Sequence, residues 1–246
     1  MKICLDAGHG IGTPGKRSPD CTLIEYEFNR DVTMRLKKIL ENHGIEIILT
    51  CYDDVDVPLG SRCKIANQNK ADYFVSIHAN AYGECWNDAR GWEALIIGKG
   101  GKAERLAECI RKHSIKDLGL KDRGVKVQNC QVLRDTNMPA VLIEHGFYTN
   151  KEECGILKTE GFRQKCAEAD AKGILEYLGI EYNEEKTEKP IIQDWKIEQY
   201  QKALARGFIT DKTWIDRLND TVCVAEVFAM LNNLYEKHSK GDDKWQ

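Results

Sequence analysis

Four side chains carry the groups that a catalytic metal centre requires. His9, His78 and Glu144 each follow a short apolar run, and Glu25 opens an amphipathic stretch. The apolar runs, residues 2–8, 73–77 and 140–143, have the composition of buried strands. In a parallel α/β sheet, the carboxyl ends of neighbouring strands meet at one edge, where ligands bind. Two imidazoles and a carboxylate at that edge, with a further carboxylate from the first helix, indicate a zinc hydrolase.

The immediate surroundings of these residues suit that chemistry. A catalytic zinc takes three protein ligands and keeps one position for water, whose pKa falls to about 7. Gly8 and Gly10 flank His9 and let the backbone turn tightly off the strand. Partial loss of solvent at Glu144 would raise its pKa towards the range of a general base. No HExxH motif is present, and His78 as a core histidine with Glu144 as a helix cap stays an open alternative.

The elements that must position these residues alternate along residues 1–180. Strands are expected at residues 2–6, 45–50, 72–77, 92–97, 130–134 and 140–145. Helices are expected at residues 25–42, 60–69, 101–117 and 160–178. This alternation predicts an α/β fold, with one mostly parallel twisted sheet of about six strands and helices on both faces.

The pattern changes after Gly179. Residues 181–190 are almost wholly polar and end in Pro190, which is typical of a linker. Helical spacing returns at residues 195–205 and 222–235 and predicts a small all-helical unit over residues 191–246. So short a unit buries little core by itself. We therefore expect it to pack on a second copy in a homodimer, on the first domain, or on a target.

Composition narrows the partners and the compartment. A net charge of −3 argues against nucleic acid or an anionic membrane as the main partner, and no apolar stretch approaches the roughly 20 residues of a membrane span. Met1 and Lys2 lead directly into the first strand, so we expect synthesis in the cytoplasm without a signal peptide. The 10 cysteines are scattered without a CxxC pair, which favours reduced packing cysteines over a structural zinc ribbon.

Several separate motifs occur in one order along the first 180 residues. They are residues 3–10 (ICLDAGHG), Glu25 with Asn29, residues 76–80 (SIHAN), residues 91–93 (GWE), and Leu133-Arg134 followed by residues 138–150 (MPAVLIEHGFYTN). Together these segments resemble the zinc-dependent N-acetylmuramoyl-L-alanine amidases of the amidase type 3 family, which includes phage endolysins and bacterial autolysins.

The resemblance assigns roles to the four residues. It implies that His9, Glu25 and His78 bind Zn²⁺ and that Glu144 is the catalytic carboxylate. The implied enzyme is a peptidoglycan hydrolase that cleaves the amide bond between the lactyl group of N-acetylmuramic acid and L-alanine of the stem peptide. Zinc-activated water would attack, with Glu144 as general base and then acid. Such an enzyme would act on the cell wall after release or lysis.

Neighbouring residues compete for some of these roles. Glu27 lies at the same helix start as Glu25, but the four-residue spacing to Asn29 favours Glu25. His145 should point to the opposite side from Glu144 if the strand continues, yet it stays a candidate for lining the substrate groove. Asn80 and Arg134 are further candidates for that lining.

Two other functions are compatible with the sequence. A zinc peptidase acting on stem peptides would use the same metal centre. A non-catalytic wall-binding protein is the second alternative, although the complete set of four residues argues against a decayed site. Residues 191–246 loosely resemble the helical halves of S-layer-homology-type wall-attachment modules, which suggests wall targeting.

Overall fold

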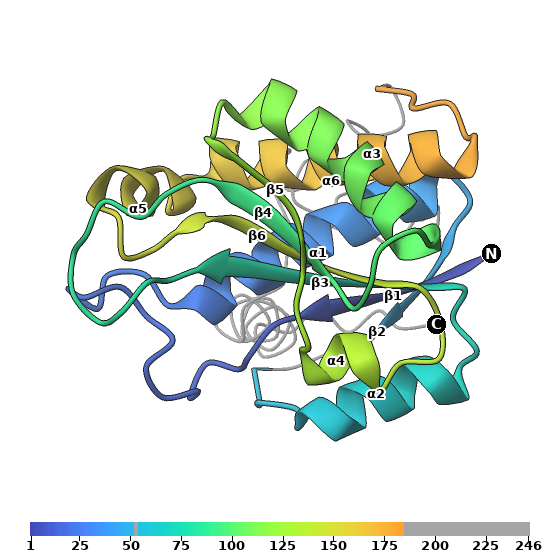
Figure 1. Cartoon of the computed structure of the whole chain (residues 1–246), viewed down its shortest axis with the longest axis horizontal. Helices are drawn as coiled ribbons and strands as arrows, with labels where there is room; N and C mark the ends of the chain where they lie inside the picture. The colour runs from blue at the N-terminus through green and yellow to red at the C-terminus, as the bar shows by residue number, and fades with distance from the viewer. Residues whose placement is uncertain (52–53, 185–246) are drawn as a thin grey trace, which may run out of the picture. The chain divides into compact units, whose positions relative to one another are not determined.

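The structure, a computed structural model, describes residues 1–51 and 54–184, which form a six-stranded sheet covered by helices on both faces (Figure 1). The strand order is β2-β1-β3-β6-β4-β5. The strands are β1 (Lys2–Ala7), β2 (Glu46–Leu49), β3 (Tyr73–Asn80), β4 (Trp92–Ile96), β5 (Asp122–Val127) and β6 (Ala140–Phe147). The expected α/β class and strand number are confirmed.

The helices divide between the two faces of the sheet. On one face lie α1 (Glu25–Asn42), α3 (Lys102–Leu118) and α6 (Glu160–Leu178), and on the other lie α2 (Leu59–Gln68) and the short α4 (Gln131–Arg134) (Figure 1). A further helix, α5 (Lys151–Leu157), follows β6. Each face therefore has its own hydrophobic core. On β3, for example, Phe74 joins the core under α2 and α4, while Val75 and Ile77 join the opposite one.

The direction of two strands corrects the prediction of a mostly parallel sheet. The sheet is mixed: β1, β2, β3 and β6 run in one direction, and β4 pairs antiparallel with β6 and parallel with β5. A parallel return to the sheet needs a crossover of a dozen or more residues, usually through a helix. Residues 81–91 between β3 and β4 contain no helix. The chain therefore makes no such crossover, and β4 begins at the same end of the sheet at which β3 finishes.

One predicted strand is wrong. Residues 130–134 were expected to be extended, but residues 131–134 form α4, whose Val132 and Leu133 pack in the core under α2. The strand in this region is β5, which has no continuous apolar run because it is a half-exposed edge strand. Edge strands face solvent along one side and tolerate polar residues such as Lys126.

The C-terminal quarter of the chain, residues 185–246, lies outside this description. The chain divides into two units, Met1–Thr187 and Glu188–Gln246. The predicted helices at residues 195–205 and 222–235, and the homodimer expected through them, fall outside the described residues. Within residues 1–51 and 54–184, no helix is long and apolar enough to cross a membrane. All cysteines in that part of the chain are free thiols.

Candidate metal centre

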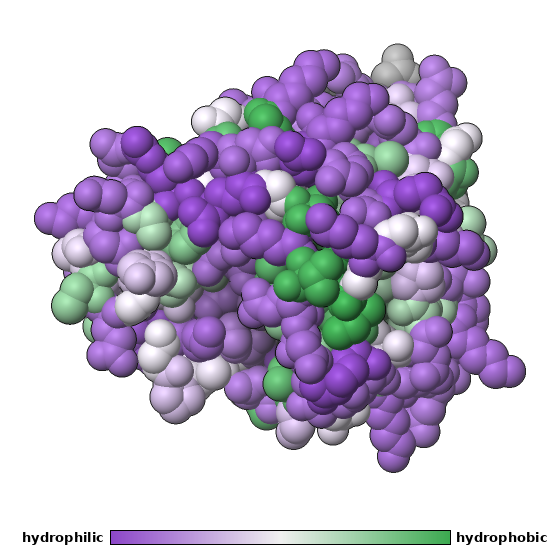
Figure 2. All heavy atoms as spheres, in the orientation of Figure 1, coloured by the Kyte–Doolittle hydropathy of each residue, from purple (hydrophilic) through white to green (hydrophobic). Residues whose placement is uncertain are grey.

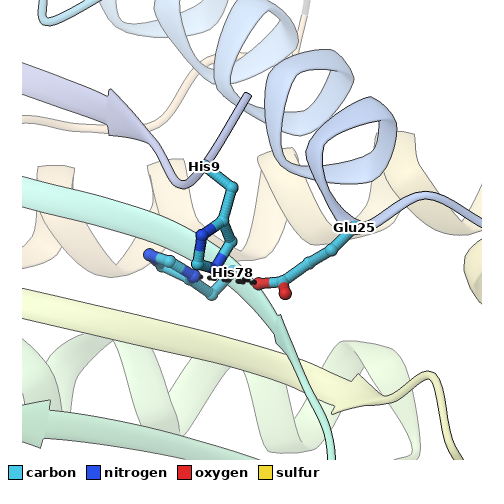
Figure 3. Close-up of side chains that lie close together, drawn as sticks. All are labelled: His9, Glu25 and His78. Atoms are coloured by element: carbon cyan, nitrogen blue, oxygen red, sulfur yellow. Dashed lines mark hydrogen bonds and ion pairs between the residues drawn. The ribbon is translucent and has the colours of Figure 1, made fainter. Parts of the chain in front are cut away.

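Three residues from three separate elements converge at the end of the sheet. His9 lies in the turn after β1, Glu25 is the first residue of α1, and His78 lies near the end of β3 (Figure 3). Glu25 Oε1 is 3.3 Å from His9 Nε2 and 2.9 Å from His78 Nδ1. One donor atom from each residue lies within 4.8 Å of the others.

The spacing of these atoms fits a zinc ion. With bonds of about 2.0–2.1 Å in a tetrahedral site, neighbouring ligand atoms lie about 3.3 Å apart. The separations of Glu25 Oε1 from the two imidazole nitrogens, 3.3 and 2.9 Å, are close to that value. Imidazole nitrogen and carboxylate oxygen are both zinc donors, and three ligands leave a fourth position for water.

Gly8 allows the two histidines to approach one another. A Cβ at Gly8 would lie 2.0 Å from the His78 ring, so any other residue would displace that imidazole. The two rings are 5.0 Å apart between centroids and nearly perpendicular. His9 itself has a φ of 65°, a left-handed conformation that is uncommon outside glycine. The turn after β1 is therefore shaped for this constellation.

Glu25 is held as a charged carboxylate. Only 2% of it is exposed. Burial alone would raise its pKa, but hydrogen bonds and charge interactions with His78 and His9 outweigh burial and hold the pKa well below its usual range. Asn29, one turn along α1, places its Nδ2 3.4 Å from Glu25 Oε1. The competing Glu27 is exposed, which agrees with the preference for Glu25.

Glu144 lies on the strand next to His78 and brings a second carboxyl group to this end of the sheet. It is the register partner of His78 in the parallel β3–β6 pair, so both side chains leave the same face of the sheet. Its Oε2 is buried and makes no hydrogen bond within the described part of the chain. Burial, and then the charges of Glu25 and Glu93, raise its pKa well above the usual value. Such an orphaned oxygen is rare in proteins and calls for a functional explanation.

The three residues expected to line a substrate groove have different surroundings. Asn80 ends β3 and donates from Nδ2 to Glu93 Oε1 at 3.1 Å. Arg134 is exposed, and its guanidinium pairs with Asp135. His145 is fully buried on the opposite face from Glu144, with Nε2 3.1 Å from Asp170 Oδ1. The burial of His145 does not agree with a lining role, because alternate residues of β6 point to opposite faces.

A pocket opens beside the candidate metal site. Its volume is about 460 Å³, and its lining includes His9, Lys16, Pro58, His78, Gln131 and Leu142. Figure 2 shows the surface hollowed beside the ends of β1 and β3, with mostly hydrophilic residues around the hollow. The pocket is large enough for part of a peptide or a sugar residue.

Sequence reasoning missed two residues of this region. Arg62 lines the pocket and is only 1% exposed, and Glu93 is a buried carboxylate that Arg123 and Lys126 both contact. A signal existed for Arg62, since it is a charged residue beside Cys63 and Ala66 on the buried face of α2. Glu93 lies in the GWE motif of residues 91–93, but no role was assigned to it, because its charged neighbours come from β5, which was not predicted.

An α/β domain with a His–Glu–His cluster at its strand ends, beside a carboxyl oxygen of Glu144 that has no hydrogen-bond partner among the described residues, defines a candidate metallohydrolase. The chain belongs to the N-acetylmuramoyl-L-alanine amidase family, Amidase_3, which it matches over residues 3–176. This confirms the resemblance drawn from the sequence motifs.

Individual relatives agree with the family. The endolysin of Bacillus phage SPP1 is 35% identical over 181 residues, which are 72% of this chain and 66% of the endolysin. The sporulation-specific N-acetylmuramoyl-L-alanine amidase of Bacillus subtilis is 33% identical, over 73% of this chain and 69% of that enzyme. Among solved structures, the catalytic domain of CwlV, an amidase from Bacillus (Paenibacillus) polymyxa var. colistinus, matches with a TM-score of 0.68 and 35% identity, covering 73% of this chain and 99% of that domain.

Proposed function

We propose that the protein is a zinc-dependent N-acetylmuramoyl-L-alanine amidase that hydrolyses peptidoglycan. The bond cleaved joins the lactyl group of N-acetylmuramic acid to L-alanine of the stem peptide. Family membership and the names of the relatives support this activity. The observation that carries the proposal is the convergence of His9, Glu25 and His78 beside Glu144, whose Oε2 has no hydrogen-bond partner within residues 1–51 and 54–184.

The residues divide the chemistry between them. His9, Glu25 and His78 would hold the ion, which supplies Lewis acidity that activates water and polarises the amide carbonyl. Glu144, whose Oε2 has no competing partner in the described part of the chain, takes the proton of the attacking water and then delivers it to the departing amine nitrogen of L-alanine. The charged state of Glu25 suits a ligand, because its pKa is held low.

The cleaved bond can be identified directly. Purified peptidoglycan is digested with the protein, with and without a chelator, and the products are analysed by mass spectrometry. We expect free stem peptides with an intact L-alanine amine and glycans whose N-acetylmuramic acid residues carry free lactyl carboxyl groups, and we expect both to disappear with the chelator and return with added Zn²⁺. Cleavage within the stem peptide would instead identify a zinc peptidase, and full activity in the chelator would overturn the metal assignment.

Among the residues expected to line the groove, Asn80 has the strongest case. It holds Glu93, which is the register partner of Glu144 in the β4–β6 pair. We propose that Asn80 shapes the groove floor through Glu93. Arg134 and His145 have no comparable link, because Arg134 pairs with Asp135 at the surface and His145 is buried.

We further propose that the protein acts on the cell wall after release or lysis and that residues 191–246 attach it there. Deletion of residues 187–246 should leave hydrolysis of short soluble muropeptides intact and reduce pelleting with purified cell walls. Unchanged pelleting would exclude wall targeting. Light scattering of both forms tests dimerisation, since a dimer formed through these residues would become a monomer on deletion.

A further inference from the structure

Three consecutive carbonyl groups around His9 are held by buried side chains. Arg62 donates from Nη1 to the carbonyl oxygen of Ala7 at 2.5 Å and from Nη2 to that of His9 at 2.7 Å. Asn29 donates from Nδ2 to the carbonyl oxygen of Gly8, between them, at 3.0 Å. Arg62 is 1% exposed and Asn29 is fully buried. The backbone of this turn is therefore fixed at each residue from inside the protein.

The other donors of Arg62 are also occupied. Its Nε donates to the carbonyl oxygen of Val57 at 2.7 Å, Nη1 also contacts Asp6 Oδ1 at 2.7 Å, and Nη2 contacts Asp56 Oδ1 at 3.1 Å. A guanidinium has five N–H groups. These three acceptors and the carbonyl oxygens of Ala7 and His9 account for all five. Asp6 supplies the buried countercharge, and it also accepts hydrogen bonds from the hydroxyls of Thr50 and Ser76. The guanidinium is thus held in one orientation.

The turn needs such support because its conformation is unfavourable. His9 has a φ of 65°, and a left-handed conformation is unfavourable for a residue other than glycine. The direction of the His9 imidazole depends on that backbone. Asn29 also lies 3.4 Å from Glu25 Oε1, so one amide group contacts both the His9 turn and a second candidate ligand.

We propose that Arg62 and Asn29 are positioning residues that hold the His9 turn in its metal-binding geometry before the metal arrives. Neither side chain is a ligand, and each acts through the backbone of residues 7–9. Partners that orient metal ligands typically contribute 10–100-fold to metal affinity. This inference rests on the proposed metal site formed by His9, Glu25 and His78.

Zinc affinity of the full chain tests the proposal. Metal is removed, and the Zn²⁺ dissociation constant is measured by competition with a chromophoric chelator for the wild type, Arg62→Lys and Asn29→Ala. Lysine preserves the charge beside Asp6 but cannot reach the carbonyl groups of Ala7 and His9 with a planar fork. We expect zinc binding about 10–100-fold weaker in both variants. The visible spectrum of the Co²⁺-loaded Arg62→Lys protein should shift as the His9 ligand moves.

A matched substitution separates positioning from general stability. Arg163 lies on α6, and its guanidinium donates hydrogen bonds to the carbonyl oxygen of Leu157 and to Asp31, away from the metal site. Arg163→Lys removes these bonds. It should change the melting temperature of the metal-free protein but leave zinc affinity within about twofold of the wild type.

The outcomes are distinct. Zinc affinity unchanged in Arg62→Lys, with a lower melting temperature, would overturn the proposal and leave Arg62 a purely structural residue. If Arg62→Lys does not fold, Asn29→Ala decides the question, because it removes an independent donor to the same turn. A wild-type protein that does not bind zinc would overturn the proposed function itself, and the inference with it.

Discussion

At the scale of single residues, the site separates the pKa values of two buried carboxyl groups. Glu25 and Glu144 both lose solvent, yet the pKa of Glu25 is lowered and that of Glu144 is raised. The difference comes from their partners, because Glu25 contacts two imidazoles and Oε2 of Glu144 has no hydrogen-bond partner in the described residues. Opposite shifts of this kind assign different roles to two acids. Here they favour Glu25 as a permanent anion and Glu144 as a proton carrier.

The first prediction concerns Glu144→Gln, which preserves the size of the side chain and removes its ability to take a proton. We expect turnover of peptidoglycan to fall about 10²–10⁴-fold, with zinc content unchanged by metal analysis. Glu152→Gln is the matched control, because Glu152 is 85% exposed on α5. Ordinary turnover by Glu144→Gln would remove Glu144 from the mechanism.

At the scale of elements, α6 packs closely against both α1 and α3. Its inward side carries small residues, including Ala167, Ala171 and Gly173, and these are buried. A Cβ at Gly173 would lie 2.3 Å from the Cα of Ile110 on α3, so the two backbones almost touch at this point. The crossing of α3 and α6 therefore depends on glycine at one position. Both helices cover the face of the sheet opposite the pocket.

The second prediction follows from that crossing. Alanine is normally preferred over glycine inside a helix by about 1 kcal/mol, but Gly173→Ala should lower the free energy of unfolding by about 1–3 kcal/mol through overpacking. Gly161→Ala, in the first turn of the same helix, meets no atom within 4 Å and should be neutral or stabilising. Urea denaturation of both variants measures the difference. Equal changes in the free energy of unfolding for the two variants would show that α3 and α6 can move apart at Gly173 without destabilising the protein.

At the scale of the whole molecule, the candidate metal site joins distant parts of the chain. His9 follows β1, Glu25 begins α1 and His78 is in β3, and these segments come together only in the folded state. An ion that binds the folded state alone stabilises it by about 4.1 kcal/mol at 1,000 times its dissociation constant. Metal binding at this candidate site would therefore be coupled to folding.

The third prediction is that Zn²⁺ raises the melting temperature of the metal-stripped protein. For a domain of this size, a gain of about 4 kcal/mol corresponds to about 10 °C. His78→Ala should fold but show little response to Zn²⁺, because one ligand is missing. Differential scanning calorimetry with and without Zn²⁺ provides the measurement. An equal zinc response in His78→Ala would show that the ion binds elsewhere.

Local patterns in the sequence predicted a large part of this fold. The apolar runs before His9, His78 and Glu144 form β1, β3 and β6, and the amphipathic stretch at residues 25–42 forms α1 with the predicted bounds. Edge strand β5 was missed because an exposed edge has no apolar run to mark it. The helix α5 was missed because it is short, although the Asn150 side chain caps its first turn.

By itself, the sequence predicted which side chains could carry the chemistry and placed three of them, His9, His78 and Glu144, at apolar runs that form buried strands, because residue type and hydrophobic period are local properties. Only the tertiary structure decided that β4 runs against β6, that His145 is buried beside Asp170, and that Arg62 reaches the His9 turn. These outcomes depend on contacts between residues far apart in the chain. Such contacts follow from how the elements pack together, which no local pattern records.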